Sequence, residues 1–195
     1  EYEDLAIILN AMALVAAAEG NNREAMALCV AQIRLWRNLA ARMGIPGLEI
    51  HAAQPWINIA RLNRWQGDFV SSSGIYTALD PLARNQRNQL NHEYDIVANF
   101  EQLGQVKGSE QFLLGLDTIY WIEYGRYLLQ MNEHQALREH GRAVMNGSIY
   151  PELKGMLLEI LFLSQASCGH GLQLLPTLAK LSKSANRRKY FILLT

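Results

Sequence analysis

The chain has 195 residues, half of them hydrophobic, and its 18 basic and 18 acidic side chains give a formal net charge of zero. A chain of this length can bury a sizeable core. Because the charges balance, the molecule has no overall electrostatic attraction to nucleic acid or to a membrane surface, and we expect direct contact with neither. Charged residues make up 18%, against roughly 25% in typical soluble domains. This low fraction predicts that a second copy, or other domains of the same chain, cover part of the surface.

The cysteines and the two ends of the chain bear on its location and extent. Cys29 and Cys168 make no disulfide framework, and neither has another cysteine at metal-ligand spacing, which favours a reducing cytoplasm. The sequence starts at an acidic run without an initiator methionine and stops within the apolar run "KYFILLT". We therefore expect residues 1–195 to be one domain of a longer chain. The apolar stretch "AIILNAMALVAAA" is shorter than the roughly 20 residues that cross a bilayer, so it predicts a buried helix.

Helical periodicity runs along the whole sequence and strand signals are almost absent, so we predict an all-α fold. The predicted helices span residues 2–18, 22–43, 53–66, 69–79, 82–103, 106–116, 118–131, 133–145, 151–166, 171–183 and 185–194. For the sixth and seventh of these there is an alternative, a single helix over residues 109–131 without the break near residue 117.

Short joints that contain glycine or asparagine separate many of these helices. The clearest are Gly20-Asn21-Asn22, Gly67-Asp68-Phe69 and Gly104-Gln105-Val106, with weaker copies at Met131-Asn132-Glu133 and Cys168-Gly169-His170. Glycine can adopt the left-handed conformation that ends a helix, and a following Asn or Asp can cap the next one. The sequence therefore predicts repeated antiparallel helix pairs joined by tight corners.

Residues 56–81 resemble a tetratricopeptide repeat, a helix-turn-helix unit of roughly 34 residues. The resemblance rests on Trp56, the small Ala60, the "QGDF" corner and Tyr76, while Ser72 stands where the family usually has alanine. The same register in "LNAMALVAAAEGNNREAMALCVAQI" selects Ala13, Gly20, Ala25 and Cys29. In "IYWIEYGRYLLQMNEHQALREHGRAV" it selects Tyr120, Tyr127, Ala136 and Ala143.

This resemblance implies a solenoid of irregular antiparallel helix hairpins, with about ten or eleven helices over residues 1–195. The long spacing between hairpins also resembles, more loosely, the sensor solenoids of maltose-regulator-type LuxR-family transcriptional activators. That second resemblance implies an effector-sensing domain of a bacterial transcriptional regulator.

The first helices of the hairpins in such a solenoid line a concave groove, which predicts a non-catalytic binding module without a cofactor. Its ligand would be a peptide, a protein partner or a small effector. Asparagine side chains in a groove can bond an extended peptide backbone, and arginines can hold carboxylates. The candidate groove residues are Asn10, Ile57, Arg61, Arg64, Asn91, Tyr94 and Trp121.

An alternative is a metal-dependent helical-bundle enzyme that uses paired His and Glu residues. The candidate pairs are His92-Glu93, Glu133-His134 and Glu139-His140. Adjacent residues point about 100° apart on a helix, so the two side chains of a pair cannot both face the interior of a bundle. The Glu-x-x-His spacing of di-iron bundles is missing, and we expect these histidines at the surface or at helix caps, with no metal.

The other residues with chemical potential have structural interpretations. We expect His170 at a helix joint and Cys168 as a buried thiol. The basic run Lys180, Lys183, Arg187, Arg188 and Lys189 fits a solvated helix end. The aromatic side chains of Tyr120, Trp121, Tyr124 and Tyr127 fit a helix core, or secondarily a groove lining. No phosphate-binding glycine loop or esterase motif occurs.

Overall fold

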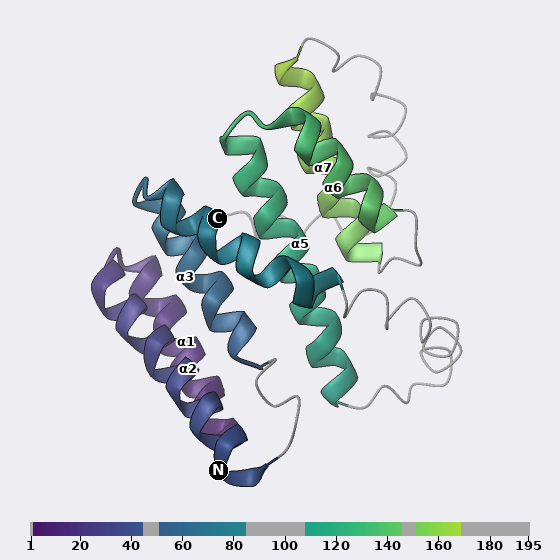
Figure 1. Cartoon of the computed structure of the whole chain (residues 1–195). Helices are drawn as coiled ribbons and strands as arrows, with labels where there is room; N and C mark the ends of the chain where they lie inside the picture. Colours follow the sequence, from purple (N-terminus) through teal and green to yellow (C-terminus); the bar gives the residue numbers. More distant parts are fainter. Residues whose placement is uncertain (1, 45–50, 85–107, 146–150, 169–195) are drawn as a thin grey trace. The chain divides into compact units, whose positions relative to one another are not determined.

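The computed structural model describes residues 2–44, 51–84, 108–145 and 151–168 (Figure 1). Within these ranges every regular element is a helix and no strand occurs, so the all-α prediction is confirmed for them. The helices are α1 (Tyr2–Ala18), α2 (Asn22–Met43), α3 (Ala53–Trp65), α5 (Gly108–Gln130), α6 (His134–Met145) and α7 (Pro151–Ser167). A further helical segment spans residues 69–84. The chain divides into two compact units, residues 1–87 and 88–195.

Two predicted helix breaks are absent. Residues 69–84 are helical throughout, so the break predicted at residues 80–81 is absent, while residues 85–103 of the predicted helix 82–103 lie outside the described residues. Pro81 removes one backbone donor, but an ion pair of 2.6 Å between Arg84 Nε and Asp80 Oδ2 spans that turn. The continuous helix α5 shows that the alternative of a single helix, without a break near residue 117, is the correct one. The predicted helices 171–183 and 185–194 and the corner at Gly104 lie outside the described residues.

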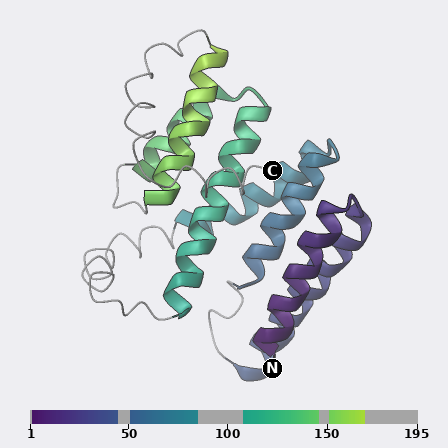
Figure 2. The same ribbon diagram turned by 180° about the vertical axis from the view of Figure 1, so that it is seen from behind.

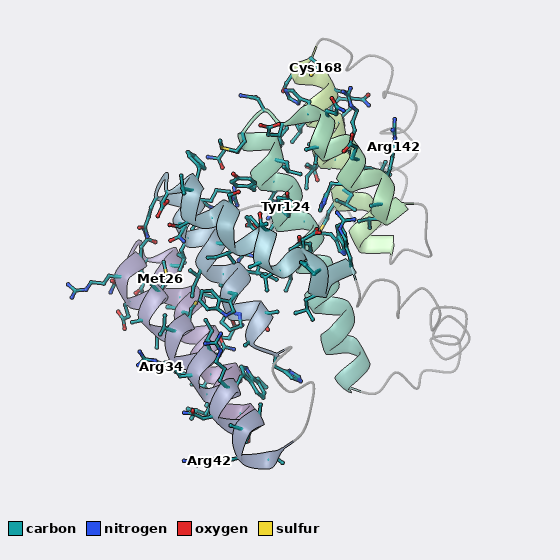
Figure 3. The ribbon with its side chains drawn as sticks, viewed as in Figure 1. Met26, Arg34, Arg42, Tyr124, Arg142 and Cys168 are labelled. Carbon is teal, nitrogen blue, oxygen red and sulfur yellow. The ribbon has the colours of Figure 1, made fainter. Side chains whose placement is uncertain are left out.

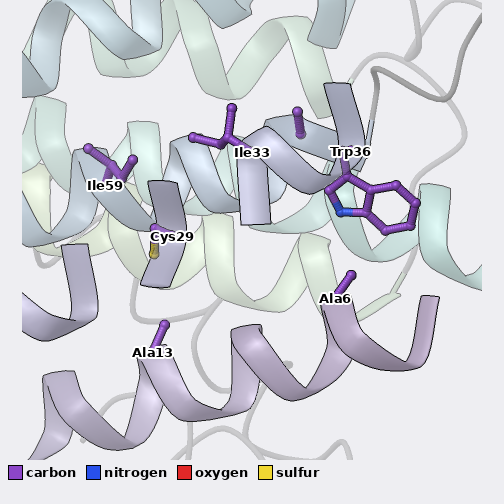
Figure 4. Packing of buried hydrophobic residues seen from close by; sticks show 7 residues of the cluster. Ala6, Ala13, Cys29, Ile33, Trp36 and Ile59 are labelled. Atoms are coloured by element: carbon purple, nitrogen blue, oxygen red, sulfur yellow. The ribbon is translucent and has the colours of Figure 1, made fainter. Parts of the chain in front are cut away.

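In the first unit, α1 and α2 form an antiparallel hairpin and α3 packs against α2. Ala6 and Ala13 of α1 are directed towards α2, as Figure 4 shows. Because these side chains are small, the two helix backbones can approach closely. The shared core consists of Ala6, Ala13, Cys29, Ile33, Trp36, Ala52 and Ile59. Inside this interface the buried Gln32 donates from Nε2 to the Ala6 carbonyl at 3.2 Å.

Three helix corners close with one backbone pattern. Each has a left-handed residue, namely Gly20 (φ 79°), Gly67 (φ 82°) and Asn132 (φ 58°). In each corner the backbone N–H of the residue after the left-handed one donates to a carbonyl in the last turn of the preceding helix. These bonds run from Asn21 to Ala16 at 2.8 Å, from Asp68 to Asn63 at 2.9 Å, and from Glu133 to Leu128 at 2.9 Å. These bonds satisfy carbonyls that the end of the helix leaves open. The hairpin α1–α2, the pair of α3 with helix 69–84, and the hairpin α5–α6 therefore turn in the same way.

The residues that pack around these corners are equivalent too. Ala25, Ser72 and Leu137 each lie five residues after the left-handed residue of their own corner. All three are 0% exposed. Ser72 keeps its hydroxyl satisfied by donating to the Ala60 carbonyl at 2.9 Å. Before the corner the equivalent residues are the small and buried Ala13, Ala60 and Gly125. Small residues at this position let the two helices of each hairpin approach closely.

In the third hairpin the predicted packing register is wrong by one residue. Ala136 is half-buried and Ala143 is exposed, whereas Leu137 and Val144 are completely buried. The cause is the corner itself, because the left-handed residue is Asn132 and not its neighbour before it. Asparagine is one of the few residues with a side chain that tolerates this conformation.

In the second unit, α5, α6 and α7 each pack against the other two. Leu137, Val144 and Leu157 are completely buried. Helices α6 and α7 meet at Gly141, where an added Cβ would lie 2.9 Å from Leu161 Cδ1. The carboxylate of the buried Glu123 is paired with Arg126 Nη1 at 2.7 Å, and this ion pair compensates the negative charge that α5 buries.

The Asn21 and Asp68 side chains cap the helices that follow them, as predicted. Asn21 Oδ1 accepts the Glu24 N–H at 3.3 Å, and Asp68 Oδ1 accepts the Ser71 N–H at 3.0 Å. Hydrogen bonds from the Ser71 side chain and then from its backbone N–H hold the pKa of the Asp68 carboxyl below its usual value of 3.8. The charged carboxylate is therefore the better cap.

We predict that replacing Gly67 by alanine lowers the free energy of unfolding by about 1–2 kcal/mol, the cost of a left-handed residue with a Cβ. Steric contact contributes nothing, since no atom lies within 4 Å of the added carbon. Gly74 is the matched control, because it has equal space but lies inside helix 69–84 without a positive φ. Gly74→Ala should therefore stabilise by about 0.5–1 kcal/mol. Urea denaturation measures the free energy of unfolding of both variants. A change in the same direction for both would contradict the assignment of the corner.

We also predict an acid-dependent contribution from Asp68. Its pKa is lower in the folded chain, so its stabilisation is complete above the unfolded value and is lost as the pH falls through 3.8 towards the folded value. In Asp68→Asn, which keeps a capping oxygen, the fall of melting temperature between neutral pH and the region below 3.8 should be shallower. Superimposable pH profiles for the two proteins would count against this cap.

Candidate functional site

A shallow pocket, partly open to solvent, lies between α1 and α3 in the first unit. It is lined by Ala13, Leu14, Ala17, Cys29, Asn58, Arg61, Leu62 and Trp65. Most of these belong to the first helices of the first two hairpins, and Cys29 of α2 contributes from the second helix of the first hairpin. Because the pocket is shallow and partly open, it suits contact with one side chain of a ligand better than enclosure of a small molecule.

A side-chain hydrogen bond ties the two hairpins together beside this pocket. Asn58 Nδ2 donates to Asn10 Oδ1 at 3.0 Å, although the two residues lie 48 positions apart. Asn58 is buried and Asn10 is half-buried. This bond gives the buried Asn58 amide nitrogen a partner and ties α1 to α3 at this level.

Arg61 brings positive charge to the pocket. The Arg61 side chain is half-buried and lies near enough to the Cys29 thiol to affect its ionisation. Burial raises the pKa of Cys29 to about 11, and the nearby guanidinium offsets only part of that rise. The thiol is therefore neutral at physiological pH and does not offset the charge of Arg61.

The described structure brings together only part of the predicted groove. Asn10 and Arg61 lie at the pocket, and Arg64 is half-buried one turn further along α3. Ile57 and Trp121, however, are each 1% exposed. Their expected position on a groove surface is corrected to the core, because α3 and α5 carry buried residues over more than one face. Asn91 and Tyr94 lie outside the described residues.

Of the residues that line the pocket, the sequence interpretation selected only Arg61 as a ligand contact, and it missed Trp65, Leu14 and Asn58 among others. Trp65 is 55% exposed and Leu14 is 45% exposed, so both offer apolar surface to a ligand. Asn58 had a detectable signal, since it is a lone amide within the otherwise apolar stretch "WINIA". Such a residue needs a polar partner when it is buried, but the sequence does not reveal that Asn10 supplies it.

His134 and His140 have structural contacts. His140 is 4% exposed, and its Nε2 lies 2.8 Å from the Trp121 carbonyl oxygen. The expected surface position of His140 is therefore wrong, although its neighbour Glu139 does point elsewhere, as an exposed residue. His134 Nδ1 bonds Ser164 Oγ at 2.7 Å across α6 and α7. Over the described ranges no group of three His, Cys, Asp or Glu residues gathers at metal-binding distance. His92 and Glu93 lie outside them.

The remaining candidates divide between core and surface. Tyr120, Trp121 and Tyr127 are buried, so the core interpretation of these aromatic residues is confirmed. Cys168 is exposed at the end of α7 (Figure 3), and the expected buried thiol is corrected. The reason is its place directly after the last helical residue, where no other described helix covers it. His170 and the basic run at residues 180–189 lie outside the described residues.

None of the helices in the described part of the chain is long and apolar enough to cross a membrane. Comparison with protein-family models, with curated proteins and with solved structures finds no match. The geometry of the pocket between α1 and α3 is therefore the basis for inferring function.

We predict that one of the two thiols reacts in the native chain. Cys168 is exposed, whereas Cys29 is buried with its pKa raised to about 11. Titration with a chromogenic disulfide at pH 8 should release one equivalent rapidly, and a second only after denaturation. Cys168→Ser should abolish the rapid equivalent and Cys29→Ser should keep it. Two rapid equivalents in the native protein would contradict the burial of Cys29.

Proposed function

We propose that the chain is a non-catalytic binding module whose pocket between α1 and α3 receives an acidic side chain of a peptide or protein partner. The observation that carries the proposal is the convergence of Arg61, Asn58 and exposed apolar surface on this pocket. A binding site of this kind combines an apolar wall with a few polar groups that set orientation.

Charge decides which partner fits. Helix α3 contains Arg61 and Arg64 and no acidic residue. None of the residues that line the pocket is acidic either. Guanidinium groups bind carboxylates through paired hydrogen bonds, so a glutamate, an aspartate or a terminal carboxylate is the preferred group. The exposed ring of Trp65 adds a flat apolar surface for the adjoining part of the ligand.

The repeated corners support the wider architecture of this proposal. Three hairpins share their left-handed residue, their hydrogen bonds and their buried positions. Such equivalence is what stacked tetratricopeptide-like units require. We extend it to an irregular solenoid over the whole chain, with about ten or eleven helices and a groove along its first helices.

A sensor domain of a bacterial transcriptional regulator is a second form of the same proposal. Its support, besides the looser resemblance, is the Asn10–Asn58 bond that joins two hairpins beside the pocket. A ligand that competes for these amides changes how α1 and α3 are held. Such a ligand can shift the domain between states if it binds one of them more tightly.

The test begins with a random peptide library selected on the full chain. We expect the selected peptides to be enriched in Asp and Glu. For one of them, Arg61→Ala should weaken binding in calorimetry roughly ten- to a hundredfold, because a hydrogen bond to a charged group contributes about 1.5–3 kcal/mol. The melting temperature should stay nearly unchanged, since Arg61 is half-buried at the pocket and not in the core.

Arg34→Ala is the matched control. It removes the same charge from the exposed surface of α2, outside the residues that line the pocket. The affinity of the selected peptide should not change. Selected peptides without acidic enrichment, or equal effects of the two substitutions, would refute the assigned pocket.

A further inference from the structure

The outer face of α1 carries an apolar stripe that no described helix of the first unit covers. The stripe consists of Leu5, Ile8, Met12 and Val15, with exposed fractions of 44%, 52%, 48% and 57%. Their spacing of three, four and three residues aligns them along one side of the helix. An adjoining side of α1 presents Ala6, Ala13 and Ala16 to the core. Figure 2 shows α1 in front of α2, with no described helix of the first unit lying over it.

The first unit contains a covered copy of this stripe. When the two hairpins are aligned on the left-handed Gly20 and Gly67, the stripe residues of α1 correspond to Ala52, Pro55, Ile59 and Leu62. All four of these are buried. Ala52 and Ile59 pack in one cluster with Cys29, Ile33 and Trp36 of α2, and Leu62 packs with Ala25 of α2. The side of α3 that corresponds to the stripe is therefore the side that α2 occupies.

We infer that the stripe of α1 is a docking surface for an amphipathic helix that packs on α1 as α2 packs on α3. Exposed apolar side chains in a continuous row are characteristic of interaction sites, whereas scattered single ones are not. A helix fits better than an extended strand, because the spacing of three and four residues matches ridges on a second helix. This surface is separate from the pocket of the proposed function, which is lined by Leu14 and Ala17 of α1 and by none of the four stripe residues.

Charge determines the kind of helix. Acidic residues flank the stripe at both ends, since Asp4 stands before it and Glu19 after it, and α1 itself contains no Lys or Arg. A second copy docked through its own α1 would set acidic ends against acidic ends, whether the two helices run parallel or antiparallel, and like charges at an interface oppose binding. The partner is therefore a helix with basic residues near its ends.

Helix α2 itself has this chemistry and provides a probe. Its ends carry Arg23 and Arg42, with Arg34 and Arg37 between them and Glu24 as its single acid. Arg34 and Arg42 project from the helix in Figure 3. A labelled peptide of residues 22–43, with Cys29→Ala to prevent disulfide formation, therefore reproduces the helix that covers the equivalent side of α3.

The test measures binding of this peptide to the full chain by fluorescence anisotropy. We expect saturable binding that Ile8→Glu and Met12→Glu each weaken about tenfold or more, since each places an unpaired charge in an apolar contact. Val70→Glu is the matched control, because Val70 is an apolar residue on helix 69–84 that is 84% exposed. It should change the affinity by no more than about twofold. Circular dichroism and melting establish that each variant is folded.

Two peptide variants test the remaining parts of the inference. Ile33→Glu in the peptide should abolish binding, because Ile33 belongs to the face that packs with Ile59. Replacing both Arg23 and Arg42 of the peptide by glutamate should weaken binding at low salt, with a smaller effect at high salt.

Each other outcome overturns the proposal. Absence of saturable binding means that the stripe is no helix-docking surface. Binding that is insensitive to Ile8→Glu means that the peptide replaces the resident α2 instead of docking on α1. A dimer of the chain in sedimentation equilibrium that Ile8→Glu dissociates would assign the stripe to a second copy.

Discussion

A left-handed residue closes each of the three described helix corners, and the position of that residue decides which side chains of the two helices meet. Once Gly20, Gly67 and Asn132 are placed, the small residues before them and the buried residues after them follow at fixed spacing. A side chain at the close-approach position must be small because both backbones converge there. The corner thus links a local backbone conformation to the packing of a whole hairpin.

This link also separates the surfaces of α1. Residues on one side enter the core with α2, Leu14 and Ala17 face the pocket shared with α3, and the stripe from Leu5 to Val15 remains exposed. Helix α3 has the same three sides, but α2 covers the one that corresponds to the stripe. A repeated unit therefore explains why equivalent residues are buried in one hairpin and exposed in the other, without any difference in their chemistry.

The sequence was sufficient for the features that depend on local backbone chemistry. Gly20 and Gly67 were predicted as corners because glycine adopts the left-handed conformation at little cost, and Asn21 and Asp68 were predicted as caps for a similarly local reason. Asn132 was harder, since its corner has no glycine, and the packing register around it was displaced by one residue. Features set by distant contacts were missed. The apolar run around Ile57 does not say which helices cover each side of α3, and nothing near His140 indicates that the Trp121 carbonyl lies 2.8 Å away.

The pocket between α1 and α3 illustrates how burial and charge act together. Burial is the larger influence on Cys29, so its thiol stays neutral even beside a guanidinium. A thiolate there would cancel the charge of Arg61 and leave a neutral pocket. Because the thiol stays protonated, Cys29 adds no negative charge beside Arg61, and none of the residues that line the pocket is acidic. The apolar surroundings of Cys29 thus keep a negative charge out of the pocket.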